Sequence, residues 1–368
     1  MNTERASAAK TILLTGGAGF IGSNFVELAL ERGHKVVVLD ALTYAGHPEN
    51  LEAFSSAKDQ FVFVKGNILD RELSLKLLRE HQIDWFLNFA AESHVDKSIT
   101  GPAAFVETNV MGTFQLLSSA KEYFDSLAGL KKVDFRYLQV STDEVYGTLG
   151  DTGKFSESTS YQPNSPYSAS KAGADHLVRA WFHTFGLPVI TTNCSNNYGP
   201  KQFPEKLIPH MILCALTGKA LPVYGKGNNI RDWIHVKDHA RGILAALEKG
   251  MPGETYCFGG NCERTNLDVV KAIAAELDQA RPMSGGKKYE SLIQFVQDRP
   301  GHDFRYAIDD SKAQKELGYS RQYLNFEQGL KDTVQWYLAN LNWVERVTAK
   351  PGVKVKYDWA LLGKAVKA

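Results

Sequence analysis

The chain has 368 residues, of which 43% are hydrophobic and 23% are charged. This length and composition indicate a globular protein with one large or two medium domains and a sizeable core. The 42 basic and 41 acidic residues leave a net charge of +1. Such a balance gives no reason to expect a nucleic-acid partner or a charged membrane surface.

Targeting and metal-binding patterns are not found in the sequence. Residues 1–10 are polar and do not predict a secretory signal. No apolar run approaches the roughly 20 residues that cross a bilayer. The four cysteines lack the spacing of a zinc site or a disulfide framework, so we expect buried free thiols and no metal. A cytoplasmic location is the resulting expectation.

Short β-branched runs alternate with longer amphipathic segments in the first half of the chain. Strands are predicted at 11–15, 35–40, 60–65, 83–90, 135–142 and 187–193. Helices are predicted at 21–32, 69–81, 103–124 and 168–185. This alternation is typical of an α/β fold with a doubly wound parallel sheet.

The pattern changes after residue 195, where prolines and glycines become frequent. We expect one domain at 1–195 and a smaller mixed α/β domain at 196–346, which is discontinuous. A segment around 230–262 is expected to return to the first domain, with a strand at 254–259 that could join the main sheet. No role is predicted for the tail at 347–368.

The turn after the first predicted strand is rich in glycine and reads Gly16-Gly17-Ala18-Gly19-Phe20-Ile21-Gly22. Glycines let the backbone approach a pyrophosphate at the N-terminus of the next helix. Asp40 ends the second predicted strand, where a carboxylate can bind both ribose hydroxyls of NAD and repel a 2′-phosphate. The sequence therefore predicts a Rossmann-type site for NAD rather than NADP.

A tyrosine and a lysine four residues apart, Tyr167 and Lys171, fall on one face of a predicted helix. A tyrosine hydroxyl has a pKa near 10 and is a poor base at neutral pH. A nearby lysine ammonium and the positive nicotinamide ring would favour the phenolate. Thr142, at the end of a predicted strand, supplies a hydroxyl that can hold a substrate oxygen. These residues predict hydride transfer.

Two adjacent carboxyls, Asp143 and Glu144, follow Thr142. Elimination of water needs one protonated and one ionised group at the same pH. Two carboxyls close together in a partly dry cleft have separated apparent pKa values, because both cannot ionise easily. The pair therefore predicts oxidation of an alcohol followed by loss of water, and the sequence leaves open which carboxyl keeps the proton.

Longer motifs resemble those of one known family. The chain is similar to the extended short-chain dehydrogenase/reductase superfamily and, within it, to the dTDP-glucose 4,6-dehydratase family, over about residues 11–337. The motifs that carry the resemblance are Ser-Thr-Asp-Glu-Val-Tyr-Gly at 141–147, Ala-Ala-Glu-Ser-His-Val-Asp at 90–96, Cys-Ser-Asn-Asn-Tyr-Gly-Pro at 194–200, Phe-Pro-Glu-Lys-Leu-Ile-Pro at 203–209, Arg-Asp-Trp-Ile-His-Val at 231–236 and Asp-Arg-Pro-Gly-His-Asp at 298–303.

The resemblance implies a hydro-lyase that converts dTDP-glucose to dTDP-4-keto-6-deoxy-glucose. Tyr167 takes the O4 proton while the C4 hydride moves to NAD⁺. Glu144 then removes the C5 proton as Asp143 protonates the departing C6 hydroxyl. The hydride finally returns to C6 and a proton returns to C5, so NAD is regenerated in each turnover.

The resemblance also implies the ligand contacts. Besides Tyr167 and Lys171, the expected NAD contacts are Gly16, Gly19, Phe20, Ile21, Gly22, Asp40, Ala41, Leu42, Thr43, Asn67, Ile68, Ala90, Ala91, Ser93, Thr108 and Asn197. The expected sugar-nucleotide contacts are Ser93, Thr142, Asn196, Glu205, Lys206, Leu207, Pro222, Tyr224, Arg231, Asn266, Asp298 and His302. Lys206 and Arg231 would meet the diphosphate, the arginine through its planar fork.

One departure from the family falls in the nucleotide site. The chain has Gly66-Asn67-Ile68 where the family usually has Gly-Asp-Ile, and an asparagine can still accept a hydrogen bond through its amide oxygen.

The helix predicted at 103–124 carries a wide apolar stripe. Either it packs only on its own sheet, or it forms a homodimer interface together with the helix at 168–185.

Three other functions remain as alternatives. A sugar-nucleotide 4-epimerase would use the same fold, NAD, tyrosine and lysine, but it needs no acid–base pair for water loss. A 4,6-dehydratase could act on a UDP- or GDP-sugar. A non-catalytic regulator that binds NAD or a sugar nucleotide would not need intact Thr142, Tyr167, Lys171 and both carboxyls.

Overall fold

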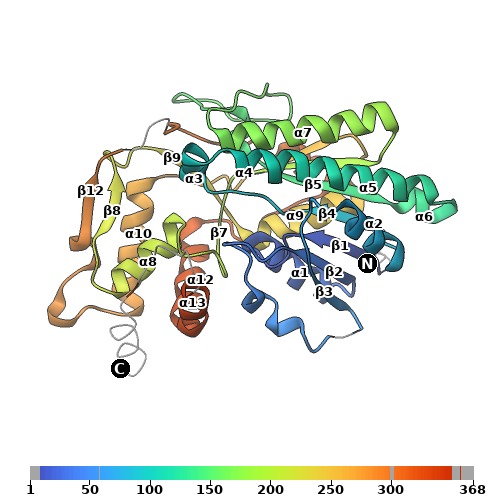
Figure 1. Cartoon of the computed structure of the whole chain (residues 1–368). Helices are drawn as coiled ribbons and strands as arrows, with labels where there is room; N and C mark the ends of the chain where they lie inside the picture. Colours follow the sequence, from blue (N-terminus) through green and yellow to red (C-terminus); the bar gives the residue numbers. More distant parts are fainter. Residues whose placement is uncertain (1–8, 58, 299–301, 350–356, 358–368) are drawn as a thin grey trace, which may run out of the picture.

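The computed structural model describes residues 9–57, 59–298, 302–349 and 357 (Figure 1). Within these residues, seven parallel strands form the main sheet in the order β10-β6-β5-β4-β1-β2-β3. Their bounds are β1 Thr11–Thr15, β2 Lys35–Asp40, β3 Phe61–Lys65, β4 Trp85–Asn88, β5 Arg136–Thr142, β6 Val189–Cys194 and β10 Thr255–Phe258. The strand order reverses between β1 and β4, which is where open parallel sheets bind ligands.

Helices cover both faces of this sheet. On β1, Leu13 faces one helical layer, whereas Ile12 and Leu14 face the other, because side chains alternate along a strand. The layer on the Leu13 side contains α2 (Arg71–Glu80), α5 (Thr113–Ser126) and α7 (Pro166–Phe185); the opposite layer contains α1 (Phe20–Glu31), α9 (Val236–Lys249) and α11 (Ser311–Leu317). The predicted doubly wound α/β fold is confirmed.

A smaller lobe lies beside the main sheet, at the left of Figure 1. It contains a three-stranded sheet, a two-stranded sheet and helices that share one apolar core. Its strands are β7 Asn196–Tyr198, β8 Leu221–Tyr224, β9 Ile230–His235, β11 Glu263–Thr265 and β12 Ile293–Val296. Its helices are α8 Leu207–Leu216, α10 Asn266–Ala280, α12 Phe326–Ala339 and α13 Leu341–Thr348. We call this part the C-terminal lobe.

Shorter elements connect these parts. They are η1 Pro48–Asn50, η2 Glu52–Phe54, α3 Val95–Thr100, α4 Ala103–Phe105, α6 Gly129–Asp134, η4 Asp143–Tyr146, η5 Ser284–Gly286 and η6 Tyr289–Leu292. Within the described part of the chain, no helix is long and apolar enough to cross a membrane.

The predicted strands are all present, and their ends differ from the prediction by at most two residues. The strand predicted at 254–259 is β10, which pairs in parallel with β6 and so joins the main sheet. All four cysteines are buried free thiols, as predicted. Most of the tail predicted at 347–368 lies outside the described residues.

The prediction of a single regular helix at 103–124 is wrong in one respect. A π-helical segment, η3 (Val106–Gly112), separates α4 from α5. At its end, a Cβ on Gly112 would lie 2.4 Å from the side chain of Ile68. The Asn109 side chain bonds the backbone N–H and C=O of Glu92 at 2.9 and 3.0 Å. These tertiary contacts favour the wider turn, and such turns often occur at functional sites.

Candidate active site

A cavity of about 330 Å³ lies at the carboxyl ends of the central strands. Its walls include the glycine-rich turn after β1, the end of β2, the end of β4, the turn after β5, and the first residues after β6. It therefore occupies the position where the strand order reverses. Together with Gly66–Ile68 after β3, these strand ends bring together residues that are far apart in the sequence.

The glycine-rich turn has the geometry of a backbone cradle. Gly16 has a φ of +71°, and a Cβ there would lie 2.6 Å from the backbone nitrogen of Ala90. A Cβ on Gly22 would lie 2.3 Å from the carbonyl oxygen of Gly16. Gly19 is the N-cap of α1 and brings no side-chain acceptor to the first helical amides. These amides can therefore bind an anion such as a pyrophosphate.

Asp40 is held rigidly at the end of β2. Its Oδ2 accepts a hydrogen bond from the Ala18 backbone at 2.9 Å, and its Oδ1 accepts one from the Leu42 backbone at 2.8 Å. The side chain lines the cavity beside the glycine-rich turn. A carboxylate in this position fits the ribose hydroxyls of NAD, and it disfavours a 2′-phosphate.

The two adjacent carboxyls lie on η4, a short 3₁₀ turn that begins directly after β5. Thr142 is its N-cap and accepts a hydrogen bond from the Glu144 backbone at 3.3 Å. Asp143 is only 2% exposed, and its Oδ2 has no hydrogen-bond partner among the described residues. Glu144 is half-buried. Both side chains line the cavity, so the two carboxyls share one site but have different surroundings.

The burial of Asp143 determines its protonation. Desolvation raises the pKa of Asp143 well above its usual value, and the neighbouring charges of Glu144 and Asp232 raise it further. The nearby Arg231 guanidinium opposes this increase without cancelling it. This shift favours the protonated form of Asp143, the state required of a proton donor.

Tyr167 and Lys171 line the cavity next to this turn. Burial raises the pKa of the Tyr167 hydroxyl well above 10, and the charge of Glu144 acts in the same direction, while a hydrogen bond with Thr142 opposes it. Lys171 is 4% exposed, and its Nζ donates to the carbonyl oxygen of Val140 at 2.7 Å. Burial lowers the pKa of Lys171. The predicted tyrosine, lysine and threonine are thus brought together.

Asp175, a buried carboxyl on the same helix as Tyr167 and Lys171, was not identified from the sequence. It lies four residues after Lys171 on α7 and is 4% exposed. Its Oδ2 accepts hydrogen bonds from Ser141 Oγ at 2.5 Å and from Tyr161 Oη at 3.1 Å. Burial raises the pKa of Asp175 to about 6. Its spacing from Lys171, on the same helix face, is the signal that could have indicated it.

Most of the predicted NAD contacts line the cavity. All of them do so except Leu42, which bonds Asp40 through its backbone instead. Asn197 lines the wall, and its amide donates to the carbonyl oxygen of Ser195 at 3.0 Å.

The predicted sugar-nucleotide contacts divide into two groups. Ser93, Thr142, Asn196, Glu205 and Lys206 line the cavity. Leu207, Pro222, Tyr224, Arg231, Asn266, Asp298 and His302 are not among its lining residues; they lie in or beside the elements of the C-terminal lobe.

Three members of the second group lie together. His302 Nδ1 is 2.7 Å from Asp298 Oδ1, and the ring centroid of Tyr224 is 6.3 Å from that of His302. Residues 299–301, between Asp298 and His302, lie outside the described residues.

The guanidinium group of Arg231 donates hydrogen bonds to backbone carbonyls. Its Nη1 donates to Ile230 at 2.7 Å, and its Nη2 donates to Asp303 at 2.9 Å. Its guanidinium carbon lies 4.2 Å from the ring centroid of Tyr306. In this arrangement the arginine contributes its charge to the neighbourhood of Asp143.

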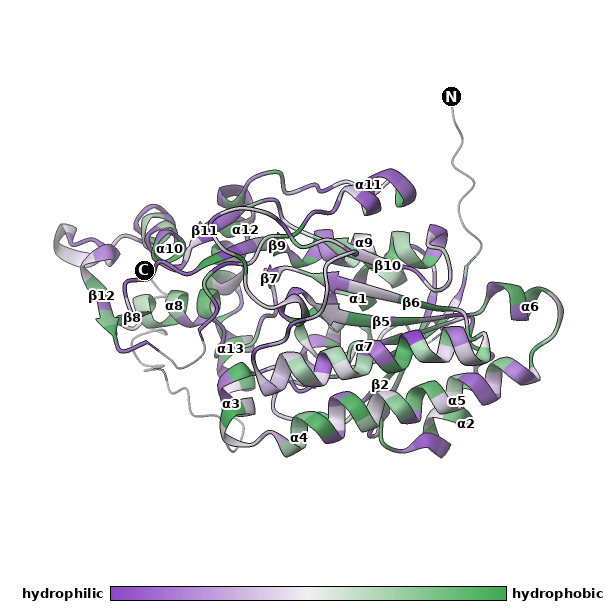
Figure 2. Ribbon diagram, turned by 90° about the horizontal axis from the view of Figure 1, so that it is seen from above, coloured by the Kyte–Doolittle hydropathy of each residue, from purple (hydrophilic) through white to green (hydrophobic). Residues whose placement is uncertain are grey.

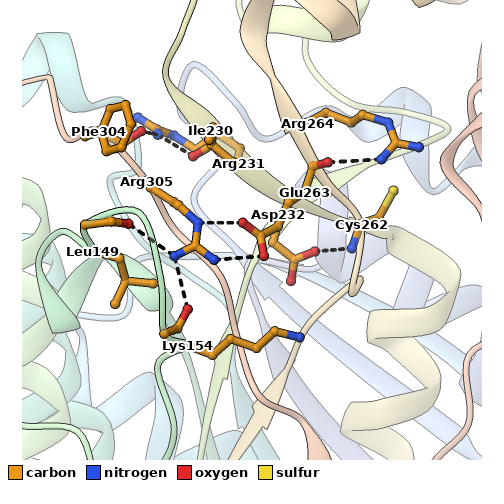
Figure 3. Close-up of polar contacts among 12 residues, drawn as sticks. Leu149, Lys154, Ile230, Arg231, Asp232, Cys262, Glu263, Arg264, Phe304 and Arg305 are labelled. Carbon is orange, nitrogen blue, oxygen red and sulfur yellow. Dashed lines mark hydrogen bonds and ion pairs between the residues drawn. The ribbon is translucent and has the colours of Figure 1, made fainter.

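A second arginine, Arg305, links the turn after the carboxyls to the C-terminal lobe (Figure 3). It pairs with both carboxylate oxygens of Glu263, at 2.6 and 3.0 Å. The same guanidinium donates to the carbonyl oxygens of Gly150 and Gly153 at 3.2 and 3.1 Å. Because Arg305 is 7% exposed, this bidentate pair holds the two parts in a fixed geometry.

Several further wall residues were not predicted as contacts. They are Leu39, Ala45, Gly46, Gly66, Phe89, Glu92, Val140, Ser141, Cys194, Ser195, Gln202 and Phe203. Many adjoin predicted residues, so extending each motif by one position would have found them. Phe203 opens the motif at 203–209 and Gln202 precedes it, but only the tertiary structure shows that both face the cavity.

Comparison with known proteins identifies the family. Residues 13–333 match the family model described as GDP-mannose 4,6 dehydratase. A dTDP-glucose 4,6-dehydratase of Xanthomonas campestris pv. campestris is 60% identical over 337 residues, which cover 92% of this chain and 95% of that protein. The chain belongs to the dTDP-glucose 4,6-dehydratase family. The predicted family and its enzyme class, a hydro-lyase, are confirmed.

Solved structures of the same family have the same fold. The dTDP-glucose 4,6-dehydratase of Bacillus anthracis, solved in complex with NAD, superposes with a TM-score of 0.81 at 46% identity and covers 92% of this chain and 100% of its own. The Streptomyces venezuelae enzyme, also solved with NAD, gives a TM-score of 0.82 at 45% identity, with coverages of 92% and 99%. The predicted NAD cofactor agrees with these complexes.

Proposed function

We propose that this protein converts dTDP-glucose to dTDP-4-keto-6-deoxy-glucose, with NAD bound in the cavity described above. The observation that carries the proposal is the pair of carboxyls on η4. Asp143 is buried, which raises its pKa and favours its protonated form, whereas Glu144 is half-buried beside it. One turn of the backbone thus presents a proton donor next to a second carboxyl, as loss of water requires.

The residues present fit NAD. The glycine-rich turn at Gly16 to Gly22 and the uncapped amides of α1 suit the pyrophosphate, and Asp40 suits the ribose. Bound NAD⁺ supplies the acceptor for the C4 hydride, and its positive nicotinamide ring favours ionisation of a nearby phenol. All proton transfers are then left to side chains of this chain.

Tyr167 carries out the first of these proton transfers. Its burial holds the hydroxyl neutral until a positive charge is near, so the phenolate that accepts the O4 proton forms only within the assembled complex, after the phenol has released its own proton to solvent. Thr142 hydrogen-bonds the same hydroxyl and orients the substrate oxygen. Lys171, fixed to the Val140 carbonyl, supplies the positive charge that favours the phenolate.

Asp143 and Glu144, on the η4 turn, carry out the elimination. Oxidation at C4 acidifies the C5 proton, and Glu144 removes it. Asp143 donates its proton to the departing C6 hydroxyl, so that water leaves. The hydride taken from C4 then returns to C6 and the proton held by Glu144 returns to C5, which gives the 4-keto-6-deoxy sugar. Asp143 takes up a proton from solvent before the next cycle.

Lys206 is the cation that we place against the diphosphate. It lines the cavity, and its Nζ donates to the carbonyl oxygen of Ser93 at 3.1 Å. The remaining contacts in the C-terminal lobe, Tyr224, Asn266 and the pair of Asp298 and His302, are proposed for the nucleoside end.

Incubation with three sugar nucleotides tests the proposal. The NAD-loaded protein should convert dTDP-glucose, without added reductant, to a product lighter by one water. UDP-glucose and GDP-mannose, run in parallel, should react poorly. Recovery of dTDP-galactose would instead show a 4-epimerase, and preferential dehydration of a UDP- or GDP-sugar would correct the nucleotide.

A homodimer is proposed through the helical layer of α5 and α7. Apolar side chains are exposed on and near this layer: Ile99 at 48%, Val106 at 52%, Met111 at 45% and Phe185 at 48%. In Figure 2, α5 and α7 lie side by side at this surface, with apolar stretches along α4 and α5. Exposed apolar clusters of this kind commonly mark interfaces. Solution mass should be twice that of the chain, and Val106→Glu should shift it to the monomer.

A cytoplasmic location is also proposed. Four buried free thiols fit a reducing compartment, in which disulfides are rare. Fractionation of cells that produce the full chain should find the protein in the cytoplasmic fraction, and recovery outside it would contradict this part of the proposal.

A further inference from the structure

The last helix of the C-terminal lobe reaches back to the nucleotide-binding turn. Trp343, on α13, is 9% exposed, and its Nε1 donates to Asn50 Oδ1 at 2.8 Å. Asn50 ends η1 and is 2% exposed. Its Nδ2 donates in turn to the carbonyl oxygen of Ala18 at 2.8 Å. A chain of two buried hydrogen bonds therefore joins α13 to the glycine-rich turn.

Ala18 is the residue at which these hydrogen bonds reach the glycine-rich turn. It lies between Gly17 and Gly19 in the turn that we assign to the pyrophosphate. The backbone N–H of Ala18 donates to Asp40, and its carbonyl oxygen accepts from Asn50 and from the His47 backbone, at 3.0 Å for the latter. Flanking glycines leave a peptide unit conformationally free, so external hydrogen bonds must fix it.

The amide of Asn50 is held in one orientation. Its oxygen faces a donor that has no acceptor atom, the indole N–H of Trp343, and its nitrogen faces a carbonyl. Trp343 is itself fixed by packing in the core of the C-terminal lobe, where its ring centroid lies 5.0 Å from that of Trp336. The nearby ion pair of Arg346 and Glu52 is exposed and contributes little by comparison.

We propose that Trp343 and Asn50 are positioning residues for NAD, through which the C-terminal lobe holds the glycine-rich turn in its binding geometry. This inference rests on the proposed NAD site but concerns residues that touch neither NAD nor substrate. It follows that NAD affinity depends on the contact between the two lobes. Loss of the Trp343 N–H should weaken NAD binding without changing the chemistry at Tyr167.

NAD titration of the stripped full-length protein, by calorimetry and without sugar nucleotide, tests the inference. Trp343→Phe keeps the ring but removes the donor, and it should raise the dissociation constant for NAD by roughly three- to tenfold, the effect of one buried hydrogen bond. The turnover number at saturating NAD and substrate should stay within about twofold, because the chemical groups are unchanged. Trp181→Phe, on α7 in the helical layer on the other face of the main sheet, is the matched control and should bind NAD like the parent protein.

Asn50→Ala tests the same series of hydrogen bonds at the residue that contacts Ala18. It should weaken NAD binding at least as much as Trp343→Phe, and the double variant should bind no more weakly than Asn50→Ala alone, because both changes break one pathway. Unchanged affinity in Trp343→Phe, an equal loss in Trp181→Phe, or additive losses in the double variant would overturn the inference. If Trp343→Phe does not fold, the Asn50→Ala titration decides alone. A parent protein that does not bind NAD would overturn the proposed function instead.

Discussion

The two ends of the cavity are built by different means. The nucleotide end is formed by backbone: glycines without side chains, uncapped helix amides, and a carboxylate fixed by two backbone N–H groups. The catalytic end is formed by buried side chains whose pKa values are shifted by desolvation, such as Asp143, Tyr167 and Lys171. Geometry therefore governs the first end, and protonation governs the second. Changes at one end should separate cleanly from changes at the other.

The largest effect is expected at the catalytic end, from Tyr167→Phe. Loss of the hydroxyl removes the acceptor of the O4 proton, so turnover should fall by roughly 10³-fold or more, near the upper range for general base catalysis. NAD affinity should change little, because the nucleotide end is intact. Measuring both quantities on one preparation checks this separation, and a large loss of NAD affinity would show that the two ends are not independent.

Glu144→Gln should allow the first step of the reaction and block the second. Oxidation at C4 still proceeds, but removal of the C5 proton fails, so reduced nicotinamide should accumulate while product formation slows by roughly 10²- to 10³-fold. Rapid-mixing absorbance measurements with dTDP-glucose follow both. Normal dehydration by this variant would show that Glu144 is not the base.

Gly22→Ala should damage the nucleotide end. The new Cβ would lie 2.3 Å from the Gly16 carbonyl oxygen, so the turn must shift. The resulting strain of about 1–3 kcal/mol should lower NAD affinity by at least about fivefold. Gly150→Ala is the matched control, since a Cβ there meets nothing within 4 Å. Equal affinity in the two variants would mean that the turn does not hold the pyrophosphate.

The smallest effect is a pH dependence of stability at Asp175. Its folded-state pKa of about 6 lies above the unfolded value, so the folded protein binds the proton more tightly. The ionised carboxylate thus destabilises the fold above pH 6, and this penalty disappears as the pH falls toward 4. Asp175→Asn should be the more stable protein at pH 7.5, by at most about 3 kcal/mol.

Urea unfolding of the parent protein and of Asp175→Asn at pH 7.5 and pH 5 measures this difference. The advantage of the variant should shrink at the lower pH. Asp151→Asn, an exposed position, should show no such trend. An advantage that grows as the pH falls would reverse the assigned sign.

The nucleotide end could be predicted almost entirely from the sequence. The glycine spacing and the strand that ends at Asp40 are local patterns, and the backbone geometry they produce depends on nearby residues. For the same reason the strand bounds were predicted to within two residues. The π-helical segment at Val106–Gly112 was not predicted, because it depends on contacts with Ile68 and Glu92 from distant parts of the chain.

At the catalytic end, the order of residues along the chain already indicates which groups are present and that they follow one strand and one helix. Their chemical environment and their connections arise from the packing of distant segments. The pKa of Asp143 is raised because folding buries this carboxyl beside Glu144 and Asp232, and Trp343 reaches the nucleotide turn because the C-terminal lobe packs against it. Desolvation and long-range hydrogen bonds arise only when separate segments meet, so no local pattern encodes them.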